Sequence, residues 1–192
     1  MKNKLITPLL VALALAELLL VFLSWILSVT TTADIHSLLS GEGLRWYLGR
    51  LNDIMLSPVL VWILLLSVSA GCLHKSRVLS HHRSYWEKLA FRMSLFVLLL
   101  YCALLVLLAA MPHAVLLSAT GQLLPSPFIH AIVPLLSFGL LVVSVCYGLI
   151  TRTFASVSDI IEAACYGLAK SAPLLLIYLL AVQLYASLRF VF

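Results

Sequence analysis

Long apolar runs separated by short polar or charged stretches dominate the pattern of the chain. Each run is close to or above the ~20 residues that cross a ~30 Å hydrocarbon core at about 1.5 Å rise per residue. The pattern therefore predicts an all-α fold, a polytopic transmembrane helical bundle, with residues 1–192 forming a single transmembrane domain. We expect five spans, at about 5–29, 54–73, 93–112, 128–151 and 171–188.

Two connecting segments carry apolar residues at helical spacing. In "LRWYLGRLNDIM" (44–55) the apolar positions form one stripe, and the charged and amide side chains lie away from it. In "SVSDIIEAACYGL" (156–168), Ser156 followed three residues later by Asp159 resembles a capping box that starts a helix. We predict two interfacial amphipathic helices; connecting helices packed on the bundle are the equal alternative.

Composition makes lipid the solvent for most of the chain. Hydrophobic residues make up 64% of the 192 residues and charged residues 10%, whereas soluble domains carry about 25% charged residues. The first apolar run is longer than the ~7–15 residues of a signal peptide, so we expect an uncleaved anchor. Cleavage there would leave four spans. The four cysteines form no CxxC pair, so no disulfide framework or zinc site is implied.

The basic charge is explained by membrane topology. With the N-terminus in the cytoplasm, nine of the 12 Lys and Arg residues fall in inner segments and three in outer ones. This bias follows the positive-inside rule. We therefore predict a multi-pass protein of the bacterial inner membrane, with a cytoplasmic N-terminus and an external C-terminus. The net charge of +5 does not indicate nucleic-acid binding.

Glu17 lies in the middle of the first span, in "ALALAELLLV". A charged side chain at the centre of a membrane helix costs roughly 2.5–3.5 kcal/mol on insertion scales. Its carboxyl group is therefore protonated, paired, or in contact with water inside the bundle. We consider Glu17 a transport candidate as a proton or ion relay. The alternative is a neutral carboxyl group hydrogen-bonded to a neighbouring helix or a partner subunit.

The histidines give a second transport candidate and no metal site. His130 stands at the outer end of the fourth span, where it could act as a pH-sensitive switch or make a structural hydrogen bond; Pro134 one turn later can kink that span. His74, His81 and His82 lie in an inner loop with only Glu87 nearby, which does not predict a metal site. Enzyme motifs are lacking, so we expect neither an enzyme nor a cofactor.

Several stretches together resemble a known family. "SLLSGEGLRW" (37–46), "SPFIHAIVPLL" (126–136), "YGLITRTFASVSDIIEAACYGLA" (147–169) and "AVQLYA" (181–186) resemble, in order, the p-aminobenzoyl-glutamate transporter family, also called the AbgT family. The resemblance covers about 5–79 and 86–188. It implies a dimeric, inverted-repeat transporter fold whose substrate sites lie on broken elements near the bilayer middle.

The chain departs from the family pattern in a way that leaves two functions open. The family's two re-entrant hairpin regions have no counterpart in it, so we expect a short form to which no family binding residue can be transferred. One hypothesis is a reduced transporter for a small anionic aromatic substrate, such as p-aminobenzoyl-glutamate, an aminobenzoate or an antimetabolite. The other is a non-transporting membrane scaffold or subunit that docks on itself or on another membrane protein.

Overall fold

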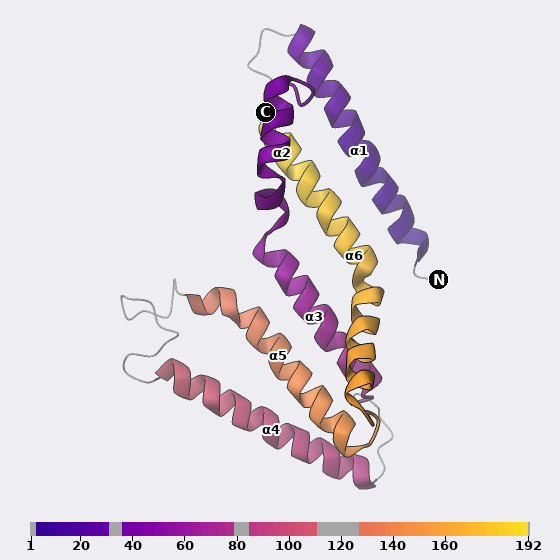
Figure 1. Cartoon of the computed structure of the whole chain (residues 1–192), viewed down its shortest axis with the longest axis vertical. Coiled ribbons are helices and arrows are strands. Elements are labelled where there is room, and N and C mark those ends of the chain that lie inside the picture. The colour runs from indigo at the N-terminus through magenta and orange to yellow at the C-terminus, as the bar shows by residue number, and fades with distance from the viewer. Residues whose placement is uncertain (1–2, 31–35, 79–84, 111–126, 192) are drawn as a thin grey trace. The chain divides into compact units, whose positions relative to one another are not determined.

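The described part of the chain consists mainly of helices. A computed structural model describes residues 3–30, 36–78, 85–110 and 127–191, and these ranges contain helices and no strand. The six helices are α1 (Asn3–Thr30), α2 (Gly41–Met55), α3 (Pro58–Lys75), α4 (Tyr85–Ala110), α5 (Pro127–Ile150) and α6 (Val157–Val191) (Figure 1). All except α2 are long and apolar enough to cross a membrane, which confirms the predicted class of fold.

Two compact units divide the chain. The first consists of Met1–Leu60 and Ala172–Phe192, and the second of Val61–Ser171. The first unit therefore contains α1, α2 and the C-terminal part of α6. The second contains α4, α5, most of α3 and the N-terminal part of α6.

The amphipathic helix predicted at 44–55 exists as α2, in the first unit. Ser40 is its N-cap, and the Ser40 hydroxyl accepts a hydrogen bond from the Gly43 backbone N–H at 3.0 Å. Gly43 has to be glycine, because a Cβ there would lie 2.7 Å from the backbone oxygen of Leu38. The Leu38 N–H in turn donates to Ser24 Oγ of α1 at 3.2 Å, which ties the start of α2 to α1.

The second span begins later than the predicted 54–73, because the chain breaks between α2 and α3. Pro58 disfavours helical conformation in the residue before it and suits the first helical position itself. Ser57 caps α3 by accepting a hydrogen bond from the Val59 N–H at 3.2 Å. The Ser57 hydroxyl also hydrogen-bonds to Tyr178 of α6, so the break is a fixed contact of the first unit.

Helices α4 and α5 run antiparallel and side by side in the second unit (Figure 1). Tyr101 of α4 donates from its hydroxyl to the Leu135 carbonyl of α5 at 2.9 Å. Gly139 lets the Tyr101 ring approach, because a Cβ at that glycine would lie 3.0 Å from the ring. The close packing of these two spans therefore depends on a glycine on one helix and a tyrosine on the other.

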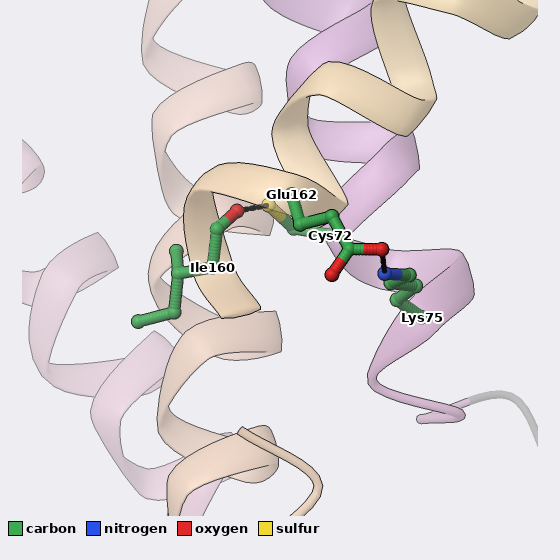
Figure 2. A network of polar contacts seen from close by, with 4 residues as sticks. All are labelled: Cys72, Lys75, Ile160 and Glu162. Carbon is green, nitrogen blue, oxygen red and sulfur yellow. Dashed lines mark hydrogen bonds and ion pairs between the residues drawn. The ribbon is translucent and has the colours of Figure 1, made fainter. Parts of the chain in front are cut away.

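Helices α3 and α6 cross closely at a pair of glycines in the second unit. A Cβ on Gly71 would lie 2.6 Å from Gly167 Cα, and a Cβ on Gly167 would lie 2.8 Å from Gly71 Cα. Next to the crossing, Lys75 forms an ion pair with Glu162 at 2.6 Å, and the Cys72 thiol approaches the Ile160 carbonyl at 4.0 Å (Figure 2). Small residues at such a crossing are typical of helix contacts in membranes.

The prediction of a second, separate amphipathic helix at 156–168 was wrong. That segment is the beginning of α6, which continues through Lys170 and Pro173 to Val191. The predicted start is confirmed: α6 begins at Val157, and Asp159 Oδ2 accepts hydrogen bonds from the Ala155 and Ser156 N–H groups at 2.8 and 3.0 Å. Only the predicted end failed, because a lysine and a proline interrupt the apolar pattern without interrupting the helix.

Helix α4 begins at Tyr85, before the predicted start at Met93. Its first two turns carry Glu87, Lys88 and Arg92, which are good helix formers but poor membrane residues. The hydropathy of this segment therefore marks the edge of the apolar run and not the end of the helix. The uncharged connection at 114–127 lies, apart from Pro127, outside the described residues.

The distribution of side chains is the reverse of a soluble protein. Large apolar side chains such as Leu19, Phe22 and Leu99 are about 60% or more exposed, whereas Ser69, Ser94 and Ser144 are at most 1% exposed. The buried serines donate hydrogen bonds to carbonyls of their own helices. Surfaces of this kind suit contact with lipid chains, with small residues between helices.

We predict that the glycine crossing limits the stability of the second unit. Gly71→Ala and Gly167→Ala should each lower the free energy of unfolding by about 1–3 kcal/mol, because the added methyl group overpacks the contact. The melting temperature of the detergent-purified protein measures this. Gly49→Ala in α2 is the control, because its Cβ meets nothing within 4 Å. It should leave the melting temperature unchanged or raise it; equal melting of all three variants would contradict the prediction.

Candidate functional site

A polar network joins α1 to the C-terminal part of α6 within the first unit. The Ser187 hydroxyl donates to Glu17 Oε1 at 2.6 Å, and Gln183 Nε2 donates to Ser187 Oγ at 3.5 Å. Gln183 and Ser187 lie four residues apart and hence on one face of α6. Both are buried, so the carboxyl group of Glu17 faces protein and not only lipid.

Two oxygen atoms of this network have no hydrogen-bond partner among the described residues. They are Glu17 Oε2 and Gln183 Oε1, and both are buried. A buried acceptor without a partner costs free energy, and a charged one costs more. A proton bound to Glu17 would remove the charge of the carboxylate and turn one of its oxygens into a donor. The site therefore places an ionisable group beside a buried amide oxygen, and neither Glu17 Oε2 nor Gln183 Oε1 has a partner among the described residues.

The other residues singled out in the sequence do not join this network. His130 lies in the first turn of α5, in the second unit, and its side chain is outside the described part of the structure. The His74 ring packs 5.5 Å from the Tyr166 ring, while His81 and His82 lie outside the described residues. In the ranges that the structure describes, no three His, Cys, Asp or Glu side chains gather in a group that could hold a metal ion.

Sequence reasoning did not assign Gln183 and Ser187 to the site. The signal was present, because a glutamine and a serine four residues apart in an apolar segment fall on one helix face. What the pattern lacked was the partner helix. Glu17 and Ser187 are 170 residues apart, and only the fold shows that they meet.

The apolar spans, the buried serines and the single carboxyl group at the α1–α6 contact define the class of protein: a multi-pass α-helical membrane protein. A protein-family model described as the AbgT putative transporter family matches residues 74–191, from the end of α3 through α6. The match covers more than half of the chain, so the chain belongs to the AbgT transporter family. Membership in a family of transporters fits the lack of enzyme motifs.

The matched segment includes Gln183 and Ser187 but not Glu17. It also includes three of the four stretches that carried the resemblance, whereas the stretch at 37–46 lies before it. No curated protein and no solved structure gives a significant match to the chain.

We predict that Ser187 stabilises the α1–α6 contact through Glu17. Ser187→Ala should lower the free energy of unfolding by about 1–3 kcal/mol, because it leaves both carboxylate oxygens without a partner. Thermal unfolding in detergent measures the change. Ser28→Ala is the matched control, since Ser28 is exposed and its hydroxyl donates to the Trp25 carbonyl of its own helix. If Ser187→Ala melts with the wild type, the hydrogen bond contributes nothing to stability.

Proposed function

We propose that this protein moves small anionic aromatic compounds across the bacterial inner membrane and couples that movement to protons through Glu17. The substrates in view are p-aminobenzoyl-glutamate, aminobenzoate-like compounds and antimetabolites. Family membership supports transport. The observation that carries the proton coupling is the buried, unpartnered Oε2 of Glu17 in the middle of α1.

The physical argument rests on the cost of the charged form. An ionised carboxylate away from water is expensive, and a bound proton removes that charge. Because Glu17 contacts Ser187 of α6, gain or loss of that proton changes the contact between two spans. A ligand that prefers one arrangement of these spans would then change proton affinity, and the proton would change ligand affinity by the same factor. His130 stays a second candidate for a pH-sensitive group.

Uptake by proteoliposomes tests this proposal. We expect wild-type protein to accumulate labelled p-aminobenzoyl-glutamate when a pH gradient drives protons inward, and to do so far less without the gradient. Glu17→Gln keeps the size of the side chain and its acceptor oxygen but cannot exchange a proton. It should lower gradient-driven uptake at least tenfold.

Glu42→Gln is the matched control, because Glu42 is an exposed carboxylate in the first turn of α2. It should leave uptake within a factor of two of the wild type. Uptake driven only by a sodium gradient, or equal uptake by Glu17→Gln, would contradict proton coupling through Glu17. Lack of flux for p-aminobenzoyl-glutamate and p-aminobenzoate by folded wild-type protein would contradict transport itself.

A second candidate function is a non-transporting scaffold that pairs with a second copy or with another membrane protein. One observation favours it. Buried serines of the spans, such as Ser67 and Ser137, donate to carbonyls of their own helices, so their hydroxyl protons are already used. In this case the wild-type protein shows no flux in any gradient, and cross-linking in native membranes captures a defined dimer or a membrane partner.

We further propose that the N-terminus is cytoplasmic and the C-terminus external. The support is the distribution of lysine and arginine residues together with the odd number of candidate spans in the described parts of the chain. Alkaline phosphatase fused after Phe192 should be active in a bacterial host, and the same enzyme fused after Lys75 should be inactive. Green fluorescent protein at the two positions should give the opposite result. A reversed pair of signals would show the inverted orientation.

A further inference from the structure

The first unit contains an open cavity of about 730 Å³ between α2 and the C-terminal end of α6. Its volume lies in the range of small-molecule sites, roughly 300–1,000 Å³. Among the residues that line it are Trp46, Arg50, Asp53, Tyr185, Arg189 and Phe190. We propose that this cavity binds planar organic anions, with the ring of the ligand on the aromatic side chains and its carboxylate on Arg50 and Arg189.

The aromatic part of the lining is organised by stacking. Trp46 of α2 and Phe190 of α6 stack with ring centroids 4.4 Å apart, and the His36 ring lies 5.7 Å from Phe190. These contacts hold the α2 and α6 sides of the cavity together. Tyr185 adds a further ring that is 69% exposed. Aromatic side chains of this kind bind flat rings by offset or edge-to-face contact.

The charges in the lining favour an anion. Two guanidinium groups face the cavity against the single carboxylate of Asp53. In the part of the chain that the structure describes, neither Arg50 nor Arg189 lies within 4.0 Å of a carboxylate oxygen. Guanidinium groups present paired donors that match a carboxylate. The lining therefore combines a net positive charge with aromatic surface.

The cavity and the Glu17 network share two turns of α6. Ser187 contacts Glu17 of α1 and Gln183 contacts Ser187, whereas Tyr185 and Arg189 line the cavity. A ligand held by Arg189 thus acts on the same stretch of helix as a proton held by Glu17. The interpretation of the cavity as a substrate site rests on the proposed transport. Ligand binding to the cavity can be tested without any transport.

The test is equilibrium binding of labelled p-aminobenzoate to the full chain in nanodiscs of zwitterionic phosphatidylcholine. We expect saturable binding that Arg50→Gln and Arg189→Gln each weaken at least tenfold and that Trp46→Leu weakens at least threefold. Arg45→Gln is the control, because Arg45 is an exposed arginine of α2 outside the lining. It should change the affinity by less than twofold. Benzoate should compete, and inorganic phosphate should not.

Each other outcome overturns the assignment. Lack of saturable binding, or binding that both arginine variants leave intact, would show that the cavity is not the site. Arg-dependent binding that is lost in nanodiscs containing phosphatidylglycerol would assign the cavity to an anionic lipid headgroup. Arg50→Lys keeps the positive charge but removes the planar pair of donors. We expect this variant to bind p-aminobenzoate more weakly than the wild type while melting at the same temperature, which excludes misfolding as the cause. Unchanged affinity in Arg50→Lys would contradict a paired contact between Arg50 and the carboxylate.

The binding assay and the uptake assay test the two proposals separately, so either proposal can be contradicted while the other stands. Arg-dependent binding without flux would contradict the proposed transport and keep the cavity as a binding site. Flux that survives Arg50→Gln and Arg189→Gln would contradict the cavity as the substrate site and keep transport.

Discussion

Contact between helices in lipid cannot depend on the burial of apolar surface, because the surrounding acyl chains are as apolar as leucine. The fold of this protein follows from that constraint. Its helix contacts include close backbone approach at Gly71 and Gly167, a glycine under the Tyr101 ring, and serines whose hydroxyl groups are satisfied within their own helices. Large apolar side chains are left on the outside, where lipid covers them.

The polar contact between α1 and α6 differs from the contacts of the buried serines. Serine side chains do not ionise, and most of the buried ones donate to carbonyls of their own helices. Their contribution to stability therefore does not depend on pH. The Glu17–Ser187–Gln183 network is different, because it joins two helices, includes an ionisable group and leaves two buried oxygens without partners among the described residues. A group whose charge is costly and whose contacts bridge two spans is where a proton can alter the arrangement of helices.

The sequence pattern predicted the class of fold, because hydropathy reports which segments lipid can solvate. It predicted helix ends less well, because backbone hydrogen bonding decides them. The charged first turns of α4 and the lysine and proline inside α6 are helical although they are not apolar. In contrast, Pro58 and the Ser57 cap ended a helix inside a region of nearly continuous apolar pattern.

The residues of the candidate site were harder to predict, because they come together only when distant segments of the chain pair. Glu17 was identifiable alone, because one carboxyl group in an apolar run is costly wherever its partners are. Its partners, and the cavity formed by α2 and α6, depend on tertiary contacts. Within α6, residues 182–190 carry both sets of groups on different faces, and this stretch lies in the segment that matches the family. Glu17 and Trp46 lie before that segment, so each site joins a matched helix to an unmatched part of the chain.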